Sequence, residues 1–339
     1  MTIDHIMSLL ATAVEPLDIV QLISRKYDNP DPAGDTANFF GYVPQIKYTV
    51  IALVAFLLVA TSQTYLMVRH KGYFMLAMLI AEFTFAAGIA VRWPMHDDPT
   101  KKGLYIIQNT LIVLSPCGFI AANYMLLGRI ARWLRCSSHM LVRPQRITLF
   151  FVLSDVFTFL IQGSGGGLSA SAGDDASKAK LGARIFLIGL ILQGVSFAFF
   201  TFMYLHFLYC VYTRESRIWN ADANKSWLHD WRGLAGALFT SCIFILIRSG
   251  YRIAELSQGY RGPISEKEGL FYLFDVLCLF LAVLVYTAFW PGRFIPGGGM
   301  EKVLTEDSDK FEGSRIAMLD AGGQGMHTPP HEYRSRPMV

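Results

Sequence analysis

Charged residues interrupt two hydrophobic segments between about residues 240 and 290, in a regular pattern. Arg248, Arg252 and Glu255 are separated by four and three positions, which places all three on one face of a helix. Glu268 and Asp275 interrupt the next hydrophobic segment with a similar period. A charge near the centre of a bilayer costs roughly 2.5–3.5 kcal/mol on the mildest scale, so it usually faces the protein interior and finds a partner. This spacing predicts ion pairs between two helices.

The depth of each residue predicts which charges meet. Two helices joined by a short loop run antiparallel, so depth can be counted in helical turns from that loop. Arg248 and Asp275 fall at similar depth and are expected to form a buried ion pair, with Arg252 between Glu255 and Glu268. Such a cluster is as consistent with a staple between two helices as with a substrate site, because buried pairs often specify packing.

Further polar residues interrupt other apolar segments. Asp155 has no basic residue at comparable depth in neighbouring segments, so we expect it to be protonated for much of the time. It could bind a cationic group when ionised, or simply hydrogen-bond to Gln193 or a backbone carbonyl. The residues predicted to border a substrate pathway, which is expected to open outward, are Arg92, Gln108, Asp155, Gln162, Gln193, Arg248, Arg252, Glu255, Glu268 and Asp275.

The composition predicts that helices crossing a bilayer position these residues. The chain has 339 residues, of which 53% are hydrophobic and 17% charged, and its mean hydropathy is +0.37. Soluble domains carry nearer 25% charged residues. Segments long enough to cross a bilayer lie at about 47–68, 73–93, 104–127, 147–168, 182–211, 234–255 and 269–290. The prediction is an all-α, polytopic membrane protein with a bundle of seven transmembrane helices.

Lys and Arg in the short loops predict the orientation of this bundle. One set of loops, which includes 128–146 and 212–233, holds nearly twice as many Lys and Arg as the opposite set. The richer set is expected to face the cytosol, which places the N-terminus outside and the C-terminus inside. We therefore predict an extracellular segment at 1–46, a transmembrane domain at 47–290 and a disordered cytosolic tail at 291–339, which is rich in Gly, Pro and charge.

Several classes of function are not supported by the sequence. The net charge of +4 is small and lies in loops, which fits membrane topology better than nucleic-acid binding. The sequence contains no Gly-x-Ser-x-Gly, no His-Glu-x-x-His and no ATP-binding signature. Only His206 among eight histidines falls in a hydrophobic segment, so no metal site is expected. We predict no catalytic residues, no cofactor and no enzymatic activity.

The polar residues also form an ordered set across five segments. This set comprises Tyr42-x-Pro44, Tyr105-x-x-Gln108, Pro116, Asp155, Gln162 with the glycine run through Gly167, Gly189, Gln193, Arg248-Ser249, Tyr251-Arg252-x-x-Glu255, Gly259, Glu268, Tyr272, Phe274-Asp275 and Pro291-Gly292. With these marks, residues 39–295 resemble the fungal RTA-like, or lipid-translocating exporter, proteins. The second segment departs from the family pattern, because Phe85 stands where a glutamate is expected. Glu82, one turn earlier, could supply that carboxylate.

The resemblance implies a seven-helix fungal membrane protein, in the plasma membrane, linked to resistance to toxic amphiphiles. It also implies movement of lipids such as sphingoid long-chain bases, and one branch of the family resembles a porphyrin transporter. The expected function is therefore translocation or export of sphingoid-base-like or sterol-like amphiphiles. The alternative is a heptahelical receptor or signalling protein. The expected partners are membrane lipids or amphiphilic small molecules, and the oligomeric state is left open.

The predicted orientation can be tested with glycosylation acceptors. An acceptor placed in the 169–181 loop should be modified in the secretory pathway, because this loop belongs to the set with fewer Lys and Arg. An acceptor in the 128–146 loop should stay unmodified, as measured by a glycosidase-sensitive shift in mass. Modification of the second acceptor alone would show that the orientation is the opposite of the predicted one.

Overall fold

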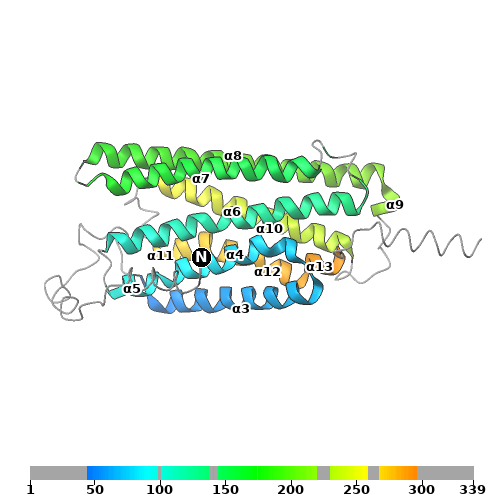
Figure 1. Cartoon of the computed structure of the whole chain (residues 1–339), viewed down its shortest axis with the longest axis horizontal. Helices are drawn as coiled ribbons and strands as arrows, with labels where there is room; N and C mark the ends of the chain where they lie inside the picture. The colour runs from blue at the N-terminus through cyan, green and yellow to red at the C-terminus, as the bar shows by residue number, and fades with distance from the viewer. Residues whose placement is uncertain are drawn as a thin grey trace, which may run out of the picture. The chain divides into compact units, whose positions relative to one another are not determined.

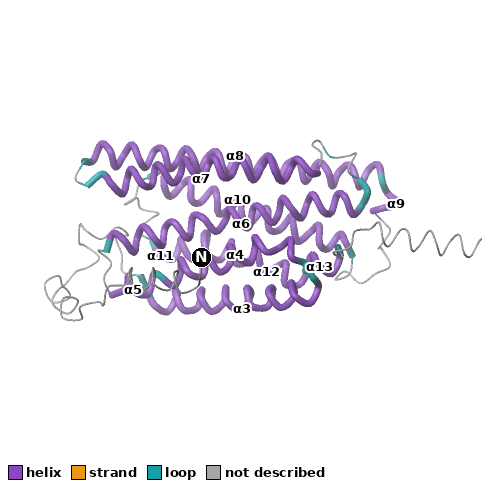
Figure 2. The backbone as a smooth tube through the Cα atoms, in the orientation of Figure 1, coloured by secondary structure: helices purple, strands orange, loops and turns teal. Residues whose placement is uncertain are grey.

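The computed structural model describes residues 44–97, 101–136, 140, 144–173, 175–219, 230–258 and 267–295. Figure 2 shows that the regular elements of this part of the chain are helices, without strands. Residues 1–43 and 296–339 lie outside the described residues, and with them most of the predicted N-terminal segment and tail. Residues 291–295, expected at the start of the tail, instead contain the short helix α13 (Pro291–Phe294), in which Pro291 and Gly292 are buried.

Seven helical segments within the described residues are long and apolar enough to cross a membrane, which confirms the predicted spans. Each extends the predicted range by a few residues or more. The elements are α3 (Ile46–His70); η1 (Tyr73–Met75), α4 (Leu76–Ala90) and α5 (Arg92–Asp97); α6 (Lys102–Trp133); α7 (Pro144–Ser171); α8 (Ala176–Arg214), followed by the short α9 (Ser216–Trp219); α10 (Trp231–Ser257); and α11 (Glu268–Leu270), η4 (Phe271–Val276) and α12 (Leu277–Ala288).

Local side-chain chemistry sets where two of the helices begin. Asp175 caps α8 by accepting hydrogen bonds from the backbone N–H groups of Ser177 at 3.0 Å and Lys178 at 3.2 Å. Asp230 caps α10 through the N–H of Arg232 at 3.0 Å. Such caps satisfy N–H groups that lack partners inside the helix. Because α8 has 39 residues, it is about 58 Å long and extends beyond a hydrocarbon core of about 30 Å.

The glycine run after Gln162, near the end of the predicted fourth span, lies inside α7, which continues to Ser171. A Cβ atom built on Gly165 would lie 2.4 Å from the backbone nitrogen of Phe186, and one on Gly182 would lie 2.5 Å from that of Ser169. The backbones of α7 and α8 are therefore in direct contact, as small residues allow in membranes. A continuous helix also keeps backbone groups hydrogen-bonded within a bilayer, where loops cannot.

The helices pack in sequence-neighbouring and more distant pairs. Figure 1 shows α7 beside α8 along one edge of the bundle, α6 and α10 across its middle, and α3, α4 and α12 toward the other edge. Aromatic rings fill the interface of α6, α7 and α8, where Tyr124 lies 4.5 Å from Phe200 and 5.1 Å from Phe151, measured between ring centroids. These contacts hold the helices that border the candidate site.

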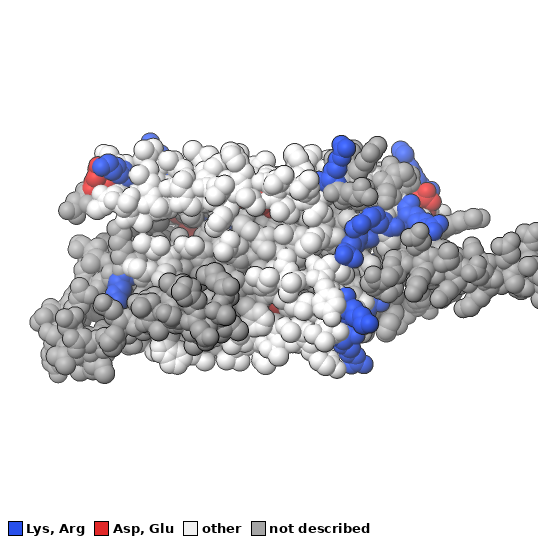
Figure 3. All heavy atoms as spheres, viewed as in Figure 1, with Lys and Arg blue, Asp and Glu red and all other residues white. Residues whose placement is uncertain are grey.

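The surface matches that of a membrane-spanning bundle. Large apolar side chains such as Phe150 and Phe157 on α7 are more than 60% exposed, so they are suited to contact with lipid tails. On the face drawn in Figure 3, Lys and Arg gather mainly at one end of the helices and the middle carries almost no charge. The basic end includes the C-termini of α3, α6 and α8, with Arg69, Arg132 and Arg214. Its cytosolic placement stays a prediction.

Candidate functional site

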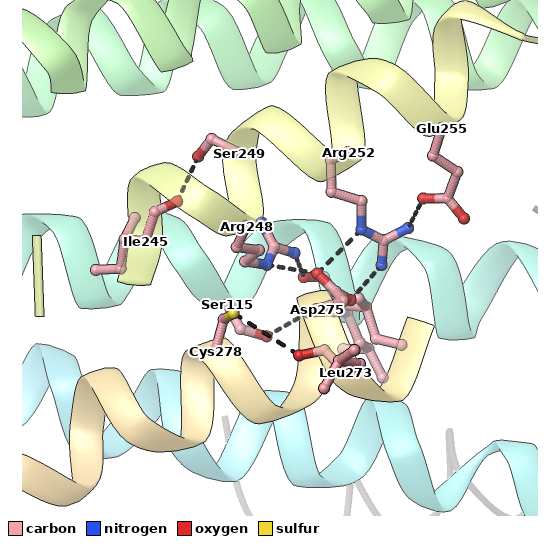
Figure 4. Close-up of polar contacts among 11 residues, drawn as sticks. Ser115, Ile245, Arg248, Ser249, Arg252, Glu255, Leu273, Asp275 and Cys278 are labelled. Carbon is pink, nitrogen blue, oxygen red and sulfur yellow. Dashed lines mark hydrogen bonds and ion pairs between the residues drawn. The ribbon is translucent and has the colours of Figure 1, made fainter. Parts of the chain in front are cut away.

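A buried cluster of opposite charges joins α10 to η4. Figure 4 shows Arg248 and Arg252 pointing from α10 toward Asp275, whose side chain is fully buried. Arg248 Nε lies 2.6 Å from Asp275 Oδ1, which confirms the predicted ion pair. Arg252 donates from Nε to Oδ1 at 3.1 Å and from Nη2 to Oδ2 at 2.5 Å. One carboxylate therefore serves two arginines, and the bond to Arg252 is bidentate.

The predicted partners of Arg252 are only half right. Its Nη1 donates to Glu255 Oε2 at 3.0 Å, as expected, but its second carboxylate is Asp275. Glu268 instead pairs with Arg92, at 3.1 Å between Nη2 and Oε1. The physical reason is the π-helical segment η4, which contains Asp275. Residues seven apart share a face in an α-helix, whereas the wider π turn separates them.

Arg248, one of the two arginines of the cluster, also contacts α6. Arg248 Nη2 donates to the carbonyl oxygen of Ile112 at 3.2 Å. In a regular helix that carbonyl would accept the N–H of residue 116, but Pro116 has no N–H. Pro116 therefore leaves an acceptor free for Arg248, and the cluster joins α6, α10 and η4.

The Arg92–Glu268 pair closes a separate contact between α5 and α11. Glu268 also accepts the backbone N–H of Gln45, at 3.0 Å to Oε1 and 3.2 Å to Oε2. The guanidinium of Arg92 lies over the ring of Phe271, 4.6 Å from its centroid. Both charged side chains are buried, and the pair fixes the start of α3 against the start of α11.

The two predicted glutamines form a third polar contact. Gln162 Nε2 donates to Gln193 Oε1 at 2.9 Å, and Gln193 Nε2 donates to Cys117 Sγ at 3.2 Å. This chain links α7, α8 and α6. The side chain of Gln193 therefore hydrogen-bonds to Gln162 and Cys117 rather than to Asp155. The hydrogen bond expected between Asp155 and Gln193 is not present.

Asp155 and Gln108 stay outside these contacts. Both Asp155 carboxylate oxygens and Gln108 Oε1 are buried without a hydrogen bond to any described residue. The hydroxyl of Tyr124 lies beside the Asp155 carboxyl without forming an aligned hydrogen bond. Glu82, considered as a partner in the second span, is fully buried and equally without a hydrogen bond in the described part of the chain.

Two adjoining cavities lie near these polar contacts, and the smaller of them borders the charge cluster. The smaller, of about 50 Å³, is lined by Tyr105, Asn109, Val113, Phe186, Leu190, Gln193, Arg248, Arg252, Glu255 and Leu256. The larger, of about 480 Å³, lies between α6 and α7, and its wall includes Phe159, Gln162 and several glycines of α7. Tyr105, Asn109, Val113 and Phe186 line both. A polar pocket with buried charges therefore opens beside a larger space with mostly apolar walls.

Sequence reasoning missed one polar network. Asn123 of α6 donates to Ser241 Oγ of α10 at 3.2 Å and accepts from the hydroxyl of Tyr286 of α12 at 2.9 Å. An asparagine inside an apolar segment is itself a visible signal, because its amide must find partners in the bilayer. Tyr105 and Asn109, which border both cavities, were also missed as a lining pair; their spacing of four positions indicates a shared face.

Similarity to known proteins identifies the family. A family model described as RTA1 like protein matches residues 78–298. The chain belongs to the RTA1-like family. Together with its seven apolar helices, this makes it an integral multi-pass membrane protein. No solved structure matches the chain.

Three relatives from Saccharomyces cerevisiae show how far this RTA1-like chain resembles named proteins. Protein RTA1 is 30% identical over 251 residues, which cover 73% of this chain and 76% of RTA1. Protoporphyrin uptake protein 1 is 32% identical over 202 residues, 60% of this chain and 63% of that protein, so less than two thirds of its length is spanned. Sphingoid long-chain base transporter RSB1 is 22% identical over 293 residues, 78% of this chain and 76% of RSB1.

Substitution of Asp275 should test the shared carboxylate. Asp275→Asn leaves two buried arginines without their common partner, so we expect a loss of roughly 3–5 kcal/mol in the free energy of unfolding, measured in detergent. Glu255→Gln is the matched control and should cost clearly less, because Arg252 keeps Asp275. If Asp275 paired with Arg248 alone, exchanging the two residues would restore the ion pair. Because Asp275 also contacts Arg252, the exchange places the new arginine at position 275 against Arg252, so we expect no recovery of stability. Equal losses for Asp275→Asn and Glu255→Gln would contradict this geometry.

Proposed function

We propose that this RTA1-like protein is a transporter that moves amphiphilic, lipid-like molecules across or between the leaflets of a fungal plasma membrane, and that it is not an enzyme. The observation that carries the proposal is the small charged pocket beside the larger, mostly apolar cavity. An amphiphile needs a polar and an apolar environment within one molecule's length. The names of two relatives, a sphingoid long-chain base transporter and a protoporphyrin uptake protein, support this choice.

The charges of the pocket suggest how a polar head is received. Asp275 is fully buried between two arginines, so it is committed to them. Glu255 is partly accessible and lines the pocket, and among the described residues its carboxylate forms an ion pair with Arg252. A cationic head, such as the ammonium of a sphingoid long-chain base, can approach Glu255 and hydrogen-bond to the side chains of Tyr105 and Asn109. Its apolar part then lies in the larger cavity.

Energy for movement would come from the substrate gradient or from protons, because the sequence carries no ATP-binding signature. Asp155 is the candidate for a proton-linked step. It lies buried on α7 beside Tyr124 of α6, without a hydrogen bond to any other described residue. A carboxyl in such a place can be protonated in one conformation of the transporter and ionised in another.

Reconstitution should separate a transporter from the receptor alternative. Purified protein in liposomes should accelerate the movement of a labelled sphingoid long-chain base between leaflets, measured by quenching of the label from outside. Glu255→Gln should slow this movement, because it removes the accessible carboxylate of the pocket, whereas Lys178→Ala on the exposed start of α8 should not. A folded protein that leaves the rate at that of empty liposomes would contradict transport and favour a receptor.

Replacement of Asp155 should test the proton-linked step. Asp155→Asn keeps the shape of the side chain and its hydrogen-bonding capacity but removes the titrating carboxyl. We expect this variant to reach the membrane at normal level yet to protect cells poorly against exogenous long-chain base, scored as growth. Asp155→Glu, which retains a carboxyl, should protect better than Asp155→Asn. Wild-type tolerance in Asp155→Asn cells would assign the residue a structural role only.

A further inference from the structure

The charge cluster of α10 and η4 contains equal numbers of opposite charges. The guanidinium groups of Arg248 and Arg252 face the carboxylates of Asp275 and Glu255, so the four side chains together are neutral. All four belong to segments that are long and apolar enough to cross a membrane. A charge that loses its partner in such a place is costly. A ligand therefore binds here most favourably if it leaves every one of these charges with a partner.

The two carboxylates of the cluster are held very differently. Asp275 is fully buried, and Arg252 donates to both of its oxygens, from Nε at 3.1 Å and from Nη2 at 2.5 Å. The side chain of Glu255 is 13% exposed, and its Oε2 lies 3.0 Å from Arg252 Nη1. Figure 4 shows Arg252 between these two carboxylates. The bond between Arg252 and Glu255 can therefore open while Asp275 keeps both of its arginines.

This ion pair also borders the smaller cavity. Arg252 and Glu255 both line it, as do Tyr105 and Asn109. Its volume of about 50 Å³ is space for a few groups of the size of a water molecule. Tyr105 and Asn109 also line the larger cavity, where the apolar part of the same ligand has room. The ion pair is thus placed where a small polar head can reach both of its members.

The balance of charge decides which kind of head this ion pair accepts best. A head with a single ammonium can pair with Glu255, but it leaves Arg252 Nη1 without its carboxylate. A head with a single anionic group can pair with Arg252, but it leaves Glu255 without its guanidinium. A head that carries both charges, a few bonds apart, gives each side chain a new partner and keeps the cluster neutral. Two charged hydrogen bonds then replace the one that opens.

We propose that the Arg252–Glu255 ion pair is a recognition site for a zwitterionic head group, which carries an ammonium and an acidic oxyanion. The proposal rests on the transport function proposed above and narrows the head group of its substrate. The ammonium binds to Glu255, the oxyanion binds to Arg252 Nη1, and Arg252 keeps its two bonds to Asp275. The oxyanion can be a phosphate or a carboxylate, since a guanidinium pairs with either.

The test compares four probes that share one saturated chain with a fluorescent label. Their heads are an ammonium, a methyl phosphate, a phosphoethanolamine and an O-linked serine, so two carry a single charge and two are zwitterions. Binding is measured to the purified full-length protein in a non-ionic maltoside detergent, where no lipid head group competes. The wild type should bind a zwitterion about tenfold or more tightly than either singly charged probe, which leaves a charge of the pair unpaired. The tighter of the two zwitterions identifies the oxyanion.

Removing one member of the ion pair should change which head binds best. Arg252→Gln leaves Glu255 without its cation, so the ammonium probe should bind at least as tightly as the zwitterions. Asp275 still pairs with Arg248 in this variant. Glu255→Gln leaves Arg252 Nη1 without its carboxylate, so the methyl phosphate probe should bind at least as tightly as the zwitterions.

Controls separate this exchange from effects on net charge and folding. Lys178→Gln, on the exposed start of α8, removes one positive charge as Arg252→Gln does, and it should leave the order of the four affinities unchanged. The thermal unfolding midpoint in the same detergent shows whether each variant is folded. Glu255→Gln keeps every bond between Arg252 and Asp275, so it tests the proposal even if Arg252→Gln does not fold.

The outcomes distinguish this proposal from the proposed function. If the ammonium probe binds the wild type as tightly as both zwitterions do, or if Arg252→Gln and Glu255→Gln weaken all four probes equally, the zwitterion site is wrong. It is also wrong if the wild type binds none of the probes yet accelerates lipid movement in liposomes, a result under which the transport function stands. A wild type that prefers a zwitterion but leaves lipid movement at the rate of empty liposomes would keep the site and contradict transport.

Discussion

The arrangement of this bundle depends on the ion pairs that the Asp275 carboxylate forms with Arg248 and Arg252. Burying a charge without a partner costs several kcal/mol, so each member of the cluster requires the others. Asp275 joins two arginines of α10, and Arg248 reaches the carbonyl of Ile112 on α6 that Pro116 leaves free. The neighbouring segments α10 and η4 are thereby fixed relative to each other and to the more distant α6. The polar pocket has a fixed wall because the charges that line it are also the charges that hold the helices.

Farther along α6, toward its C-terminus, the bundle is closely packed. Eleven positions along α6 from Ile112, or about three turns, Asn123 joins α10 and α12 through Ser241 and Tyr286. At a similar position the rings of Tyr124, Phe151 and Phe200 fill the space between α6, α7 and α8. The cavities are instead bordered by Tyr105 and Asn109, nearer the start of α6. Space for a ligand therefore lies nearer the start of α6, and the Asn123 network and these aromatic rings fill the bundle farther along it.

Much of the fold and part of the site could be predicted from the sequence. The spans follow from apolar length, and the Arg248–Asp275 pair follows from helical spacing and depth. The glycine run lies within the predicted fourth span, because backbone groups in a bilayer must stay paired, but its direct contact with α8 at Gly165 appears only in the structure. The Gln162–Gln193 contact and the isolation of Asp155 depend on how α7 rotates against α8. A single sequence does not specify that rotation.

The exchange of partners between Glu268 and Asp275 shows why local periodicity is not enough. Seven α-helical residues return to nearly the same face, so both carboxylates were expected to face α10. The π turn from Phe271 to Val276 inserts additional backbone between them. Glu268 then faces Arg92 and the start of α3, while Asp275 faces the arginines of α10. Because π turns are rare and depend on the neighbours that stabilise them, the two acidic residues could be recognised from the sequence as important, but their separate partners could be found only in three dimensions.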